Sequence, residues 1–451
     1  MEVIKNTKPN ILSGNIKRVL FALAIPIILS NFIQTLLGIV DMIWIGKLGS
    51  EAVSAIGTAS FYINLSTALT TLVCIGSGIK IAHSIGSQDK KSENIYTKNG
   101  FVISIILAML YVIIVGLFSN ELITYFGMNN LDIESMAVEY LRASLYGVPF
   151  LFLVTYFITV LTSYGETKIT FKANSIGLIL NIIVDPILIF GFGPVPAMGV
   201  SGAAWATNVA RIIILLILVL SRPEIITRSL KAKAQIRKAF EVMKMSFPVT
   251  LQRIIFIYIS MIMAKIIVQF GTDAIAVQKI GVQIESISYV TIGGLQGAIS
   301  AFIGQNYGNG NNERIKNGYN IAIKLVLFFG VLVTTVMLLF PKQLFSIFIN
   351  DPQIIGKGIV YMQAIAFSQL FMCVELLTVG AFNGIGKTYV PPIVSIMLTL
   401  LRIPLALFLS SKIGINGVWW SISISSILKG TVLYFWFKLI LSKEKYNNEA
   451  A

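Results

Sequence analysis

Long apolar segments recur along the whole chain and are separated by short polar connections. A helix of about 20 residues rises 1.5 Å per residue and crosses a hydrocarbon core about 30 Å thick. Only a helix satisfies all of its backbone polar groups within one segment in lipid, so the pattern predicts transmembrane α-helices. We place twelve of them at residues 19–45, 52–80, 98–118, 137–162, 168–190, 199–221, 241–268, 274–303, 318–340, 358–382, 388–410 and 415–441.

Composition agrees with an all-α integral membrane protein. Of the 451 residues, 56% are hydrophobic and only 12% are charged, which is far from the balance of soluble domains. The first apolar run, residues 19–44, is too long for the core of a signal peptide, and no small-residue cleavage pattern follows it. We therefore expect this run to remain as the first span.

The net charge of +15 is explained by membrane topology rather than by nucleic-acid binding. Lysines and arginines gather in alternate loops, whereas the loop 119–139 carries acids and no basic residue. The positive-inside bias then places both termini in the cytoplasm of a plasma-membrane protein. Lysines beside the spans are also expected to attract anionic membrane lipids.

The chain repeats itself. Gly86 at the end of the second span corresponds to Gly308 at the end of the eighth, and three short segments recur in the same order. The paired segments are Lys47–Ala52 with Gln269–Ala274, Gly165–Lys168 with Gly384–Lys387, and Gly199–Gly202 with Gly414–Gly417. We therefore predict an N-terminal lobe at 1–221, a basic cytoplasmic linker at 222–240 and a C-terminal lobe at 241–451.

Six spans per repeat give both lobes the same orientation, so a pseudo-two-fold axis along the membrane normal is expected to relate them. Two such lobes around a central cavity can rock to give alternating access. A packed bundle without a cavity is the alternative, because duplication alone does not prove motion.

Several motifs together resemble the multidrug and toxic compound extrusion (MATE) family over nearly the whole chain. They are Pro26 in the first span, the run Asp41–Gly49, the segment Asn181–Pro186 and the segment Ile303–Gly308. The resemblance implies export of organic cations and other amphipathic compounds in exchange for protons or sodium ions.

Acids inside spans are costly and therefore candidates for function. Asp41 and Asp185 lie at matching depths near the outer ends of the first and fifth spans, Asn181 shares a helix face with Asp185, and Thr207 reaches a similar depth. The resemblance assigns these four residues to a cation-coupling site that holds protons or Na⁺. The alternatives are a solvated helix end for Asp41 and ordinary interhelical hydrogen bonds for Asn181 and Thr207.

The resemblance also assigns a hinge to Pro26, although an ordinary proline kink is an equal alternative. The second half departs from the sodium-coupled branch of the family, because Phe256 and Met372 stand where that branch has acids. Glu285 and Glu375 are the acids present in its spans. They are candidates for attracting a cationic substrate, and an ion pair of Glu285 with Arg402 is the alternative.

A substrate cavity between the lobes is expected to be lined from the first, second, seventh and eighth spans, although ordinary helix packing explains the same side chains equally well. The expected polar and adaptable lining residues are Gln34, Asn64, Gln252, Tyr258, Met261, Gln278 and Gln283, together with Glu285 and Glu375.

These features predict a cation-coupled multidrug exporter that works as a monomer without a cofactor. The alternative is a flippase for a lipid-linked precursor. An enzyme is not indicated, because neither a G-x-S-x-G nor an H-E-x-x-H motif occurs. One histidine, His83, and two distant cysteines, Cys74 and Cys373, cannot form a structural metal site. The choice between protons and sodium stays open.

Overall fold

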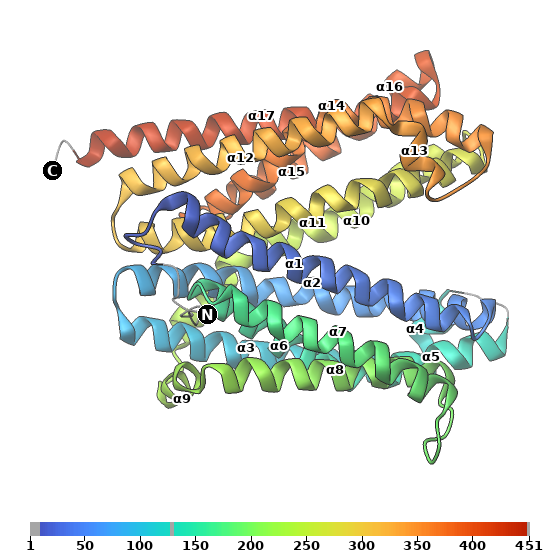
Figure 1. Cartoon of the computed structure of the whole chain (residues 1–451), viewed down its shortest axis with the longest axis horizontal. Helices are drawn as coiled ribbons and strands as arrows, with labels where there is room; N and C mark the ends of the chain where they lie inside the picture. Colours follow the sequence, from blue (N-terminus) through green and yellow to red (C-terminus); the bar gives the residue numbers. More distant parts are fainter. Residues whose placement is uncertain (1–9, 127–129, 449–451) are drawn as a thin grey trace, which may run out of the picture. The chain divides into compact units, whose positions relative to one another are not determined.

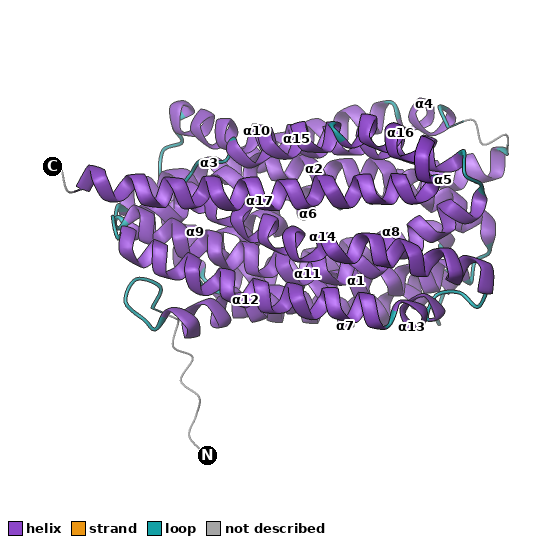
Figure 2. Cartoon of the chain, turned by 90° about the horizontal axis from the view of Figure 1, so that it is seen from above, coloured by secondary structure: helices purple, strands orange, loops and turns teal. Residues whose placement is uncertain are grey.

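The computed structural model describes residues 10–126 and 130–448, and the regular elements within these ranges are α-helices (Figure 2). Eleven spans in this part of the chain are long and apolar enough to cross a membrane. A twelfth is formed when α5 and α6, which meet at a 47° bend, count as one broken span. The prediction of about twelve transmembrane helices is confirmed.

The chain divides into two compact units, and the helices of each unit run side by side (Figure 1). The described part of unit 1 comprises residues 29–126 and 130–246, and that of unit 2 comprises residues 10–28 and 247–448. Two helices contribute to both units. They are α1 (Ile16–Gly46), whose residues 16–28 belong to unit 2, and α10 (Ile236–Val268), whose residues 236–246 belong to unit 1.

The other helices belong to one unit each. Unit 1 contains α2 (Ser50–Gly86), α3 (Lys90–Leu117), α4 (Ser119–Thr124), α5 (Leu131–Leu145), α6 (Val148–Ser163), α7 (Thr167–Phe190), α8 (Gly199–Ser221) and α9 (Pro223–Lys231). Unit 2 contains α11 (Thr272–Gly308), α12 (Asn312–Leu339), α13 (Pro341–Ser346), α14 (Pro352–Gly384), α15 (Val390–Leu400), α16 (Arg402–Ile413) and α17 (Ile415–Asn448).

The internal repeat is visible in the helix boundaries. The helices α2 and α11 both have 37 residues, α3 and α12 both have 28, and α4 and α13 both have 6. Backbone conformations repeat as well, because Gly49 and Gly271 precede equivalent helices with φ of 110° and 97°. A glycine is favoured at both positions, since residues with a Cβ rarely adopt such φ angles.

One landmark of the repeat was paired wrongly. The sequence pattern matched Gly165 with Gly384, but Gly384 is the last residue of α14. The residue that matches Gly165 in conformation is Gly386, since each has positive φ, 79° and 77°, just after a helix ends. Two glycines in close succession, Gly384 and Gly386, made the register ambiguous in the sequence.

Each unit has its own apolar core. In unit 1, Tyr156, Phe157 and Val160 of α6 pack with residues of α2, α3 and α8. In unit 2, Phe302 of α11 and Phe382 of α14 belong to a core that also includes the first turns of α1. Many other large apolar side chains are exposed. Such a surface is what a bilayer requires, because lipid tails replace water around the spans.

Candidate functional site

Asp185 and Asn181 form a buried polar pair on α7. Their spacing of four residues places both side chains on one face of the helix. The Asn181 Nδ2 donates a hydrogen bond of 3.1 Å to Asp185 Oδ1, and both side chains are fully buried. This bond satisfies one carboxylate oxygen of Asp185 and leaves the other available.

Asp41 of α1 joins this pair. Its carboxyl group lies within hydrogen-bonding reach of both Asp185 and Asn181. Within this group of three residues, one buried oxygen of each has no hydrogen-bond partner in the described structure: Asp41 Oδ1, Asn181 Oδ1 and Asp185 Oδ2. Buried oxygens normally have a hydrogen-bond partner. A group of buried oxygens without partners is therefore a suitable environment for a proton or a small cation.

Arg211 and Tyr140 complete this site, and neither was predicted from the sequence. Arg211 of α8 attracts the Asp41 carboxylate, and Tyr140 of α5 interacts electrostatically with Asp41, Asp185 and Arg211. The absence of a side chain at Gly147 makes room here, because a Cβ would collide with Asn208 and crowd Arg211. The available signal was a lone arginine in an apolar span.

Thr207 forms a hydrogen bond within its own helix. Its hydroxyl donates to the Ala203 carbonyl oxygen at 3.1 Å, and the side chain is half-buried. It lies four residues before Arg211 on α8, so it shares the face of that helix that carries the arginine. Pro26 is buried inside α1, which is assigned as one helix from Ile16 to Gly46.

The two acids of unit 2 have different partners. Glu285 of α11 accepts hydrogen bonds from Tyr361 and Gln369. Glu375 of α14 forms a buried ion pair of 3.1 Å with Lys429 and also accepts from Ser395. Arg402 attracts both acids, but its Nε donates to Ser425.

The remaining expected lining residues vary in exposure. Among the described side chains, Gln252 and Gln278 are half-buried. The others, Gln34, Asn64, Tyr258, Met261 and Gln283, are exposed. A surface hollow of about 540 Å³ on unit 1 is lined by Glu134, Glu139, Arg142 and neighbouring residues, and by none of the expected lining residues.

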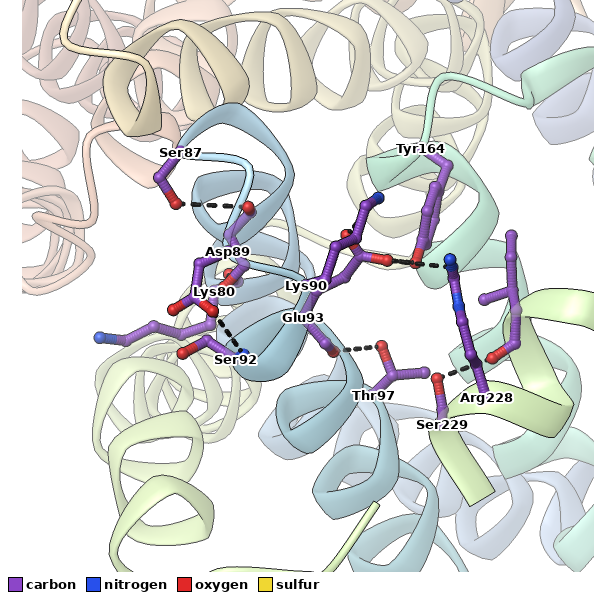
Figure 3. Close-up of polar contacts among 12 residues, drawn as sticks. Lys80, Ser87, Asp89, Lys90, Ser92, Glu93, Thr97, Tyr164, Arg228 and Ser229 are labelled. Carbon is purple, nitrogen blue, oxygen red and sulfur yellow. Dashed lines mark hydrogen bonds and ion pairs between the residues drawn. The ribbon is translucent and has the colours of Figure 1, made fainter. Parts of the chain in front are cut away.

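A further buried acid, Glu93, was also missed (Figure 3). This fully buried side chain on α3 forms ion pairs with Lys90 at 3.0 Å and Arg228 at 3.2 Å, and it accepts a hydrogen bond from Tyr164. Because Arg228 belongs to α9, this ion pair connects α9 to α3. Nearby, hydrogen bonds from the Ser92 hydroxyl and backbone N–H hold the pKa of Asp89 below its usual range.

Comparison with known proteins decides the family. A model of the MatE family matches residues 26–187 and, a second time, residues 248–408. The chain belongs to the MatE family. Members of this family are membrane transporters rather than enzymes, and the two matched segments are the two repeats of the chain.

Relatives of this MatE protein match it almost from end to end. The probable multidrug resistance protein NorM of Thermotoga maritima is 28% identical over 96% of this chain and 95% of its own length. The FAD transporter of Shewanella oneidensis is 25% identical over 94% and 95%. The crystal structure of MATE in the bent conformation has the same fold, with a TM-score of 0.89, 24% identity and coverage of 97% and 98%.

Proposed function

We propose that this MatE protein exports organic cations and other amphipathic compounds by alternating access, in exchange for protons or sodium ions. The observation that carries the proposal is the group of buried, unpartnered oxygens at Asp41, Asn181 and Asp185. Two carboxylates in contact repel each other, and a bound proton or cation relieves that repulsion.

The repulsion supplies a driving element for exchange. With the cation bound, Asp41 and Asp185 can remain close together. Without it, the pair is stabilised by separation or by closer approach of Arg211. Loading and release of a cation therefore favour different packings of α1 against α7 and α8. Each elementary charge that crosses a potential of 100 mV adds about 2.3 kcal/mol to the available driving force.

We further propose that the protein functions as a monomer in the plasma membrane, without a cofactor and with both termini in the cytoplasm. We also propose that its N-terminal lobe, linker and C-terminal lobe have the boundaries that the sequence predicts. The strong basic bias of alternate loops supports this orientation. The name of the NorM relative supports multidrug compounds as the substrate class.

Expression in a bacterial strain that lacks its own exporters tests this function. Cells that produce the wild-type chain should accumulate less of a fluorescent organic cation than cells that produce Asp185→Asn. Asp132→Asn, which changes an exposed acid of α5, is the matched control and should behave as wild type. Equal accumulation in wild-type and Asp185→Asn cells, with equal amounts of protein in the membrane, would reject the proposal.

A further inference from the structure

Unit 2 contains a buried acid whose hydrogen bonds come from neutral groups. Tyr361 donates its hydroxyl to Glu285 Oε1 at 2.5 Å, and Gln369 donates its Nε2 to Glu285 Oε2 at 3.1 Å. All three side chains are at least nine-tenths buried, with exposed fractions of 8% for Glu285, 0% for Tyr361 and 1% for Gln369.

This arrangement differs from that of the other buried glutamates. Glu375 pairs with Lys429 at 3.1 Å, and Glu93 pairs with Arg228 and Lys90. Among the described residues, Glu285 has no lysine or arginine within ion-pair distance. Arg402 attracts it only at longer range. A buried charge that lacks a close counter-ion is costly. A structural ion pair therefore does not explain why Glu285 is buried.

Gln369 supplies the second observation. Its Oε1 is buried and has no hydrogen-bond partner in the described structure. An amide N–H donates a hydrogen bond to a carboxylate. When the amide is flipped by 180°, its carbonyl oxygen accepts a hydrogen bond from the O–H of a carboxylic acid. A tyrosine hydroxyl can likewise donate or accept. The surroundings of Glu285 can therefore satisfy both its ionised form and its protonated form.

We propose that Glu285 is a proton-binding carboxyl of unit 2, with Tyr361 and Gln369 as its positioning residues. A proton suits this site better than a metal ion. Both carboxylate oxygens already face donor hydrogens, whereas a metal ion needs several oxygen lone pairs directed at it. The proton would come from water, and its use in transport rests on the coupling proposed above.

The internal repeat gives independent support. Tyr361 lies ten residues after the helix N-cap Asp351, and Tyr140 lies ten residues after the corresponding N-cap Asn130. Tyr140 interacts with the acid Asp41 and with Arg211, while Tyr361 interacts with the acid Glu285 and with Arg402. Equivalent tyrosines therefore face an acid and an arginine in each unit.

Local packing is arranged to hold Tyr361 against the acid. Gly281 lies one turn before Glu285 on α11, and a Cβ there would collide with the Tyr361 ring. The ring also packs edge-on against Trp419, with centroids 5.4 Å apart. Tyr289 of α11, Tyr361 of α14 and Arg402 of α16 interact electrostatically with Glu285. Tyr289 also interacts with Cys373 and Glu375 of α14, and Glu375 pairs with Lys429 of α17.

Infrared difference spectroscopy of the full chain in lipid nanodiscs tests this proposal without a transport assay. Acidification of the wild type should produce a carboxyl C=O band that is absent from Glu285→Gln. The band should persist in Asp41→Asn and in Glu313→Gln, which changes an exposed acid of α12. Circular dichroism of each variant verifies that its helices are retained.

Tyr361→Phe keeps the carboxyl group and therefore gives a second readout. Loss of the tyrosine hydrogen bond should move the same band to higher frequency, because hydrogen bonding weakens a C=O bond. A Glu285→Gln spectrum identical to that of the wild type would overturn the proposal, as would a band that Tyr361→Phe leaves unmoved. Since proton binding is measured directly, a failure of cation coupling in transport would be recognised separately.

Discussion

At the scale of single residues, the acids inside the spans are distinguished by their neighbours. Their spacing predicted that Asn181 and Asp185 share a helix face, and the position of Asp41 in the first span predicted that it lies at the same depth in the membrane. The residues that hydropathy could not assign were Arg211 and Tyr140, because the rotation of a helix about its axis decides which polar side chain faces the acids. The same limit concealed the buried position of Glu93.

Asp185→Asn separates stability from function at this site. The substitution removes one of two carboxyl groups in contact but keeps a hydrogen-bonding side chain of the same shape. We expect the midpoint of thermal unfolding at neutral pH to equal or exceed that of the wild type, whereas ion-driven export falls to background. Differential scanning fluorimetry and vesicle transport measure the two quantities. A clearly lower unfolding midpoint would assign Asp185 a structural role instead.

At the scale of elements, the connection between the repeats is the least predictable part of the fold. The sequence indicated a basic linker at 222–240. In the structure, this segment forms α9 and the start of α10 and packs within unit 1. Besides the Arg228 ion pair, Gln235 exchanges two backbone hydrogen bonds with the Asn99 amide. Composition identifies such a segment as polar and basic, but it does not show which partners it contacts.

Glu93→Gln should loosen α9. The substitution removes the negative charge that pairs with Arg228 and Lys90 and that accepts the hydrogen bond of the buried Tyr164 hydroxyl, at a cost of about 1–3 kcal/mol. We expect faster amide hydrogen exchange in α9 and a lower unfolding midpoint. Glu224→Gln is the control, because that side chain is 59% exposed and lies 3.8 Å from Arg222. Equal exchange in both variants would show that Glu93 does not hold the linker.

Close helix packing provides another prediction within unit 1. Gly76 of α2 lies against α10, where its N–H donates to Ser246 Oγ at 2.8 Å and where a Cβ would collide with the Val242 carbonyl. Gly76→Ala should therefore destabilise the protein by about 1–3 kcal/mol through overpacking. Gly57→Ala in the same helix has open space around it and should be neutral or slightly stabilising. Equal unfolding midpoints would contradict the close approach.

At the scale of the whole molecule, the number of spans, the duplication and the family could all be predicted from the sequence. They depend on hydropathy summed over about 20 residues and on motifs that recur with a nearly constant offset, and both signals tolerate local error. Neither signal resolves local detail. The sequence paired Gly165 with Gly384 instead of Gly386, and it did not predict the 47° bend between α5 and α6. The two repeats place their helix breaks differently, since span eleven divides into α15 and α16 whereas α7 is continuous.

Cation-coupled export is tested by efflux of a fluorescent organic cation from proteoliposomes that contain the purified full chain. A proton gradient and a sodium gradient are imposed separately, with Asp41→Asn beside the wild type. We expect efflux under at least one gradient by the wild type and efflux at background by Asp41→Asn. Gradient-driven efflux that Asp41→Asn retains in full, or no efflux by folded wild-type protein under either gradient, would contradict this expectation.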